Sequence, residues 1–268
     1  MKILFSLLFL STTFFSISQG YVPAGARSMS MGNASTTFND VWAFHNNPGA
    51  LADVDKFSVG LSYENRFLLK QLQNQGLAVA IPLKMGVLSF GGHLYGSSLY
   101  RSTKVGVGYS MKLSEKFYAG VQLNYQNLSI QNYDSKNALT AEVGIYAKIT
   151  KKWLLGISVF NLGRAKLSDY QDDRFSTVFR LGSSYQFSKK LLLSGEFDKD
   201  LDSPLRFKAG LEYEVIDNFF VRGGFMSSPT EMTFGFGYNF KQIRLNVGSA
   251  YERVVGWSPH FSISFVGK

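Results

Sequence analysis

Residues 231–240, which read EMTFGFGYNF, decide the fold. Alternate residues in this stretch are large and apolar or aromatic: Met232, Phe234, Phe236, Tyr238 and Phe240. The residues between them are small or polar: Thr233, Gly235, Gly237 and Asn239. Successive side chains of a β-strand point to opposite faces, so the alternation predicts a strand with one aromatic face and one nearly bare face. What the aromatic face contacts, protein or lipid, determines the class of the protein.

The same alternation recurs from Lys56 to the C-terminus and predicts fourteen strands. The eighth apolar face is read as Phe175, Phe179, Leu181, Tyr185 and Phe187. The connections alternate between short turns, such as residues 114–115 and 241–242, and longer loops, such as residues 128–137 and 162–173. Short turns on one side and longer loops on the other are typical of outer-membrane barrels, with the short turns in the periplasm. An even number of strands places both termini on the periplasmic side.

The aromatic faces are therefore expected to contact lipid. In hydrocarbon every backbone polar group must be paired internally, and a closed barrel pairs them without leaving an edge. A soluble β-sandwich also alternates, but its outward positions are polar and its strands are usually shorter. The predicted fold is all-β, a 14-stranded antiparallel transmembrane β-barrel in the outer membrane of a Gram-negative bacterium.

The first twenty residues predict a secretory signal peptide. Lys2 is followed by an apolar run over residues 3–15 and a small polar exit over residues 16–20. The mature chain is expected to begin near Gly20 or Tyr21, and a retained membrane anchor is the alternative. The 268-residue chain has no Cys and a formal charge of +9. It therefore needs no disulfide, and anionic lipid is one partner that its charge allows.

Residues 21–55 lack the alternation and are expected to fill the barrel, because a lumen of this size leaks unless something occupies it. The predicted organisation is a signal peptide at 1–20, an N-terminal plug segment at 21–55 and a barrel at 56–268. Asn47 can cap a short helix that begins at Pro48. Trp42 and Phe44 are expected to pack with Phe38 and the inner wall. The plug is read as a gate or, alternatively, as a filler that seals the pore, with these residues at its centre: Trp42, Phe44, His45, Asn46, Asn47 and Pro48.

The lumenal face of the strands is predicted to be wet and to carry charges of both signs. Its charged wall comprises Lys112, Glu142, Arg180, Arg206, Lys208, Glu212, Arg222 and Arg244. His45, His93 and His260 are scattered and have no metal-ligand spacing. No phosphate loop, dinucleotide fingerprint or nucleophile elbow occurs in the sequence. We therefore expect no enzyme activity, no metal and no cofactor.

Residues 25–52 read GARSMSMGNASTTFNDVWAFHNNPGALA and resemble a family. They are similar to the opening of PorV/PorQ-type outer-membrane proteins and, more distantly, of FadL-type transporters. Both share a pattern like G-A-R-x-x-x-M-G-x-A and a later turn like N-P-A-G-L-A. The matching residues are Gly25, Ala26, Arg27, Met31, Gly32, Ala34, Asn47, Pro48, Leu51 and Ala52. Gly49 and Ala50 reverse the usual order of that turn.

The PorV/PorQ resemblance implies a non-enzymatic accessory subunit of an outer-membrane secretion or assembly complex, either of type IX secretion or beside the barrel-assembly machinery. Its expected partners are outer-membrane lipid, lipopolysaccharide and other outer-membrane or periplasmic subunits, and no nucleic acid. The alternatives are a FadL-like channel for hydrophobic small molecules and a small anion-preferring pore. The mostly polar lumenal residues argue against a large apolar pocket.

Overall fold

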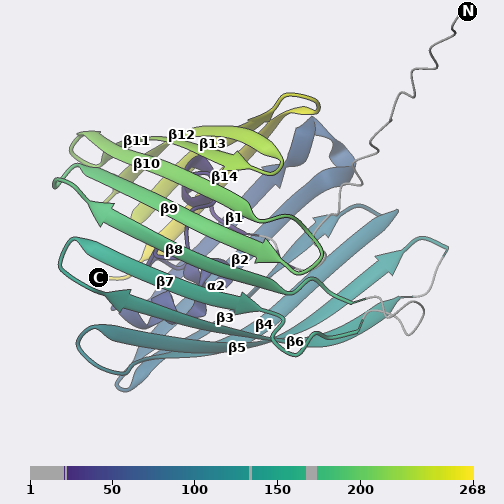
Figure 1. The fold of residues 1–268 in the computed structure, drawn as a ribbon, viewed down its shortest axis with the longest axis horizontal. Coiled ribbons are helices and arrows are strands. Elements are labelled where there is room, and N and C mark those ends of the chain that lie inside the picture. The colour runs from purple at the N-terminus through teal and green to yellow at the C-terminus, as the bar shows by residue number, and fades with distance from the viewer. Residues whose placement is uncertain (1–20, 22, 133–134, 167–173) are drawn as a thin grey trace, which may run out of the picture.

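A computed structural model describes residues 21, 23–132, 135–166 and 174–268. In it, fourteen antiparallel strands form a closed barrel in which each strand pairs with its sequence neighbours and β1 pairs with β14 (Figure 1). The predicted fold is therefore confirmed. The leader predicted for residues 1–20 lies outside the described residues. None of the helices in the described part of the chain is long and apolar enough to cross a bilayer.

The strands are β1 (Ser58–Asn65), β2 (Gln73–Leu83), β3 (Gly86–Gly96), β4 (Tyr100–Lys112), β5 (Phe117–Ile130), β6 (Lys136–Lys148), β7 (Trp153–Phe160), β8 (Val178–Gln186), β9 (Leu191–Asp200), β10 (Arg206–Ile216), β11 (Phe219–Ser227), β12 (Thr230–Phe240), β13 (Ile243–Glu252) and β14 (Gly256–Val266). The helical segments are α1 (Ala26–Ser30), α2 (Ala43–Asn46), η1 (Pro48–Asp53), η2 (Arg66–Leu68) and η3 (Lys70–Leu72).

The outer surface of the barrel is apolar around its circumference. In β12 the alternate large residues are exposed, from Met232 at 63% to Phe234 at 42%, while the lumenal Thr233 is buried. The remaining thirteen strands share this arrangement, since each has exposed aromatic or aliphatic side chains on one face. Such a surface is stable only in contact with hydrocarbon, so the aromatic faces contact lipid and the barrel belongs in the outer membrane.

The two ends of the barrel differ as expected from the connections. At one end, here called the short-turn end, the tight turns carry exposed lysines: Lys84, Lys116, Lys151, Lys152, Lys189, Lys190 and Lys241. The barrel also begins and ends there, because the Gly267 N–H donates a hydrogen bond to the Phe57 carbonyl at 2.7 Å. The first described residue, Tyr21, instead packs on Phe160 and Val178 at the opposite loop end. The expectation that both termini lie at the short-turn end is therefore wrong for Tyr21, the first described residue, because the plug runs along the lumen.

One strand face was also misread. Phe175 was assigned to the outer face of the eighth strand, but β8 begins at Val178 and Phe175 is buried. It packs on Leu128, with Tyr100 and Ala138 beside it, on the lumenal side of the loop end. Spacing alone failed here because residues 174–177 approach β8 without continuing its alternation.

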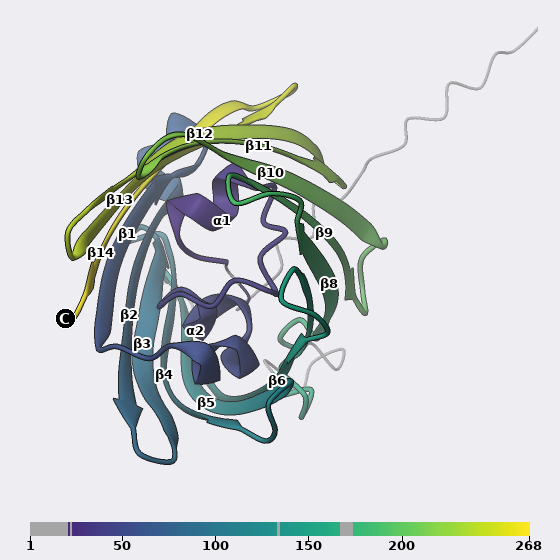
Figure 2. The same ribbon diagram turned by 90° about the vertical axis from the view of Figure 1, so that its left-hand side faces the viewer.

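The plug lies inside the barrel and rests directly on the wall (Figure 2). Close approach is possible because the lumenal face carries glycine where the two meet. A Cβ added to any of eleven strand glycines would contact a plug atom: Gly60, Gly76, Gly91, Gly120, Gly144, Gly156, Gly182, Gly210, Gly224, Gly235 and Gly248. These residues, here called the glycine belt, explain why the lumenal face of strands such as β12 is nearly bare.

We expect Gly120→Ala to destabilise the protein by about 1–3 kcal/mol, because the new methyl group overlaps the Pro48 carbonyl. This carbonyl belongs to the backbone and cannot rotate out of the way as a flexible side chain could. The matched control is Gly195→Ala, where nothing lies within 4 Å of the added Cβ. Urea unfolding in detergent, followed by tryptophan fluorescence, measures both. Equal unfolding midpoints for the two variants would show that the plug does not need the glycine belt.

Candidate functional site in the barrel lumen

The plug is shaped by a helix cap on the segment that was predicted to carry one. Asn47 precedes η1, Pro48 occupies its first position, and the Asn47 Oδ1 accepts a hydrogen bond from the Gly49 N–H at 3.0 Å. This confirms the predicted cap. The Asn47 amide also donates to the carbonyls of Thr36 at 2.7 Å and Ile145 at 3.0 Å. One side chain therefore fixes η1, the preceding plug segment and the wall at β6.

The aromatic residues of the plug separate into two groups. Trp42 and Phe44 belong to an apolar cluster with Tyr118 and Tyr146 of the wall, all of them buried. The cluster also contains Ala24, Val41, Ala43, Ala50, Leu51, Val54, Ala78, Ala80 and Val87. Phe38 was expected to join Trp42 and Phe44, but it packs with Met31 and Leu192 instead. The Arg27 guanidinium lies 4.4 Å from the centre of the Phe38 ring.

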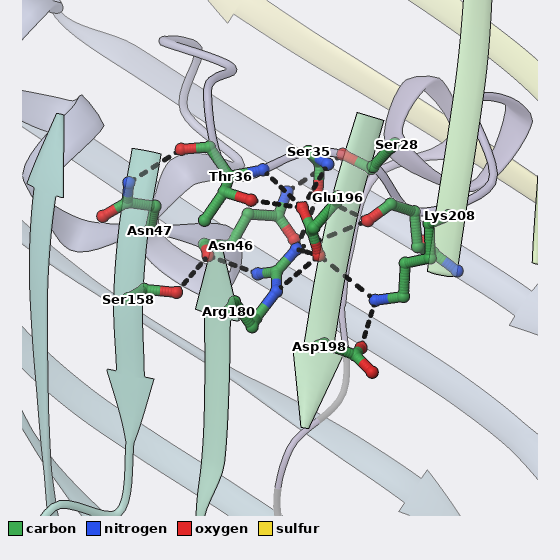
Figure 3. A network of polar contacts seen from close by, with 12 residues as sticks. Ser28, Ser35, Thr36, Asn46, Asn47, Ser158, Arg180, Glu196, Asp198 and Lys208 are labelled. Carbon is green, nitrogen blue, oxygen red and sulfur yellow. Dashed lines mark hydrogen bonds and ion pairs between the residues drawn. The ribbon is translucent and has the colours of Figure 1, made fainter. Parts of the chain in front are cut away.

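A buried ionic cluster holds the plug to β8, β9 and β10 (Figure 3). We call Arg180, Glu196, Asp198 and Lys208 the latch. The Glu196 carboxylate accepts hydrogen bonds from the plug backbone N–H groups of Ser35 at 2.9 Å and Thr36 at 3.0 Å, and from the Thr36 hydroxyl.

Two cations share the Glu196 carboxylate. Arg180 donates to Glu196 at 2.8 Å, and Lys208 bridges Glu196 at 3.2 Å and Asp198. Arg180 also donates to plug oxygens, namely the Asn46 carbonyl, the Asn33 carbonyl at 3.3 Å and the Ser35 hydroxyl at 3.2 Å. Each partner reduces the cost of burying the others, so the hydrogen bonds from the plug add to the stability of the latch.

A second ionic contact joins the plug to the adjoining part of the wall, on β10 and β11. Arg27 binds Glu212 through two hydrogen bonds, at 2.8 and 2.7 Å, the bidentate geometry that favours arginine over lysine. Arg222 donates to the same carboxylate and, at 2.9 Å, to Asn246. Further along the wall, the fully buried Lys104 pairs with Glu142 at 3.1 Å.

The predicted charged wall is thus partly buried and partly at the rim. Five of its residues are buried in ion pairs: Glu142, Arg180, Lys208, Glu212 and Arg222. Arg206 is half-buried and donates to Asp198 at 2.6 Å. Lys112 and Arg244 are exposed at the short-turn rim. The face expected to be wet is packed against the plug. How closely residues 21–55 fill the lumen could not be predicted from the alternation of the strands.

His45 of the plug is buried. Its Nε2 lies 3.1 Å from the Leu77 carbonyl, and its ring centre lies 6.1 Å from that of His93. Burial and the nearby Lys104 cation lower the pKa of His45 to about 3, while the contact with Leu77 opposes them. Within residues 21, 23–132, 135–166 and 174–268, no three His, Asp or Glu side chains are grouped so that they could hold a metal ion.

Sequence reasoning missed an apolar lining at the loop end. Tyr21, Phe160 and Val178 form one buried cluster there, with 5.6 Å between the ring centres of Tyr21 and Phe160. Leu128 and Phe175 form a second. The sequence signal for these clusters is a large apolar residue on the lumenal face of β5, β7 and β8, namely Leu128, Phe160 and Val178. The acidic latch residues Glu196 and Asp198 were also missed. Both lie on the lumenal face of β9, so the alternation of that strand could have identified them.

Among the residues that the structure describes, the ladder between β6 and β7 is short beside these clusters. β6 pairs with β5 from Lys136 onward, but its ladder with β7 covers only Val143–Lys148. Among the described residues, one backbone hydrogen bond, from the Leu162 N–H to the Ala141 carbonyl, contacts the remaining edge of β6 on this side. Residues 136–142 of β6, here called the free edge, still carry an outward Leu139 that is 76% exposed.

The fold is shared with outer-membrane channels. The monoaromatic hydrocarbon channel CymD is 12% identical with a TM-score of 0.67, over 93% of this chain and 98% of that one. The Pseudomonas putida toluene transporter TodX is 13% identical with a TM-score of 0.63, over 93% and 98% of the two chains. A Pseudomonas aeruginosa FadL homologue is 13% identical with a TM-score of 0.63, over 92% and 99%. No family model and no curated protein matches the chain. The chain therefore has a FadL-like barrel fold.

Proposed function

We propose that the chain is an outer-membrane channel for small hydrophobic molecules, which enter at the loop end and leave sideways into the bilayer above the plug. The observation that carries the proposal is the position of the apolar clusters. Phe160 and Val178 face the lumen where β7 ends and β8 begins, next to the free edge of β6. A hydrophobic solute there contacts aromatic and aliphatic side chains and does not cross the latch.

Two observations support a hydrophobic solute: the side chains that line the loop end, and the fold shared with hydrocarbon channels. Ligand sites for apolar molecules are lined mainly by aromatic and aliphatic groups, which the two loop-end clusters supply, with the cations of Lys104 and Arg180 each 5.3 Å from a ring centre of the first cluster. The mid-height lumen, by contrast, is closed by the plug and its ion pairs, which offer an apolar solute no favourable contact. Proteins of the same fold are hydrocarbon channels, and we extend only the class of solute to this chain.

We expect Phe160→Asn to lower the initial rate of uptake several-fold, because it places an amide in the apolar cluster. The assay measures accumulation of radiolabelled toluene and of a radiolabelled long-chain fatty acid by cells that lack their own hydrophobic channel. Leu192→Asn is the control, since Leu192 is also buried and lumenal but packs on Phe38, away from the loop-end clusters. If cells that express the wild-type chain take up neither probe faster than cells without it, the proposal fails.

The second candidate is the accessory subunit of a secretion or assembly complex that the PorV/PorQ resemblance implies. The feature that favours it is the plug, which is held by the latch and by Arg27 and suits a barrel that does not conduct. Exposed lysines on the short turns offer a surface to an acidic periplasmic partner or to anionic headgroups. Affinity purification from gently solubilised membranes tests this candidate, and repeated recovery of the chain without other proteins would exclude it.

A further inference from the structure

Two adjoining cavities lie at the short-turn end of the lumen, between the plug and strands β10–β14. The larger has a volume of about 260 Å³ and the smaller about 160 Å³. Both are lined by Asp40, Arg244 and Ser264, so they lie side by side. Neither is lined by residues of the loop-end clusters, so this space is separate from the proposed path of hydrophobic solutes.

Hydrogen-bond donors are concentrated on one wall of the larger cavity. Arg244 lies in register with Asn239 of β12 and Ser264 of β14, and Asn246 follows it on the same face of β13. All four residues line the larger cavity. A guanidinium offers five N–H donors and no acceptor. Arg244 has no ion pair or hydrogen bond to any residue that the structure describes, whereas Arg27 and Arg222 in the same cavity are paired.

Trp42 independently indicates that the cavity takes an acceptor. This residue lines the larger cavity and is 2% exposed. Its indole N–H has no acceptor in the part of the chain that the structure describes. Buried N–H groups nearly always have an acceptor, and the indole N–H can only donate. A ligand that accepts hydrogen bonds would serve both Trp42 and Arg244.

The charges around the larger cavity favour an anion. Its lining holds three guanidinium groups, of Arg27, Arg222 and Arg244, against the carboxylates of Asp40 and Glu212. Glu212 is shared by Arg27 and Arg222, and Asp40 lies 3.4 Å from Arg27. Within the lining of the larger cavity, the positive charge of Arg244 is therefore the one in excess. The smaller cavity is more acidic, since Asp53 and Asp55 line it.

We propose that the larger cavity binds a carboxylate, with Arg244 as its bidentate partner and the Trp42 indole N–H as a further donor. An arginine fork matches the two oxygens of a carboxylate, and such charge-assisted bonds are stronger than neutral ones. Two sources present this group at the short-turn end: a free small carboxylic acid and the C-terminal carboxylate of a polypeptide. The proposal does not depend on uptake at the loop end and can stand if that function fails.

Trp42 provides the measurement. The other two tryptophans, Trp153 and Trp257, are exposed on the outer surface, and replacing both with Phe leaves Trp42 as the only indole. The purified mature chain in detergent is titrated with succinate, with triglycine, and with triglycine amide, whose C-terminus is uncharged. We expect a saturable change in Trp42 emission with at least one carboxylate and none with the amide. Arg244→Gln should weaken binding roughly tenfold or more, as expected for loss of a charge-assisted pair.

Lys112→Gln is the matched control, because Lys112 is also a cation at the short-turn rim but does not line either cavity. It should leave the affinity unchanged, and sodium chloride at equal ionic strength should give no saturable signal. Binding of succinate alone identifies a free acid as the ligand, and binding of triglycine alone identifies a polypeptide C-terminus. The proposal is overturned if neither carboxylate gives a saturable signal, or if Arg244→Gln and Lys112→Gln have equal effects.

Discussion

Removal of residues 21–55 is expected to convert a silent barrel into a conducting pore. In planar-bilayer recordings the wild-type chain should give no steps in ionic current, and the shortened chain should give discrete, long-lived current steps. The reason is geometric: the plug lies against eleven belt glycines, so its loss leaves a fourteen-stranded wall with small side chains at that height. A barrel of this size, between the filled eight-stranded barrels and the open porins, then has room for water.

The open pore should discriminate weakly between anions and cations. The sequence alone suggested a small anion-preferring pore because of wall cations such as Arg180 and Arg222. Each of these cations is paired with a carboxylate, Glu196 or Glu212, so the net charge of the wall is small.

Exposure of the lumen is checked separately with Ser158→Cys. Ser158 is buried under Asn46, and its replacement would be the only thiol because the chain has no cysteine. A water-soluble thiol reagent should label it only after the deletion. A folded, shortened barrel that neither conducts nor is labelled would show that something other than the plug closes the lumen.

The outer half of this fold could be predicted because lipid acts on each residue separately. Outward side chains at the depth of the hydrocarbon must be apolar whatever their neighbours are, so a window of ten residues such as 231–240 already contains the requirement. Turn length is equally local, which is why the fourteen strands and their two kinds of connection were found. The helix cap at Asn47 and Pro48 was predictable for the same reason.

The inner half could not be predicted in this way, because its requirements join distant residues. Glu196 suits its position only because Ser35 and Thr36, 161 and 160 residues earlier, present their backbone N–H groups to it. Nothing near Glu196 in the sequence indicates that partner. Phe175 shows the same limit, since its contact with Leu128 depends on how the chain leaves β7. The belt glycines were visible as a pattern, but their purpose appears only with the plug in place.

Loss of the Glu196 carboxylate is the substitution expected to affect the latch most. Glu196→Gln keeps the shape of the side chain but leaves Arg180 and Lys208, both nearly fully buried, without the carboxylate they share. Breaking a buried ion pair by removing one partner costs about 3–5 kcal/mol, because the remaining charge stays desolvated. The Ser35 and Thr36 N–H groups also lose an anionic acceptor. We therefore expect the plug to loosen before the barrel unfolds.

Two measurements separate loosening of the plug from loss of the barrel. Urea unfolding should show the loss of stability, and labelling of Ser158→Cys should rise in the Glu196→Gln background while the sheet content by circular dichroism stays unchanged. Asp200→Asn is the matched control, since Asp200 is a buried lumenal carboxylate of the same strand whose side chain has no hydrogen bond to the plug among the described residues. If both variants unfold at the same urea concentration and label at the same rate, burial of a carboxylate in β9 matters but its contact with the plug does not. The plug would then be retained by the apolar cluster around Trp42 and Phe44 and by Arg27, and the latch would play no part in closing the lumen.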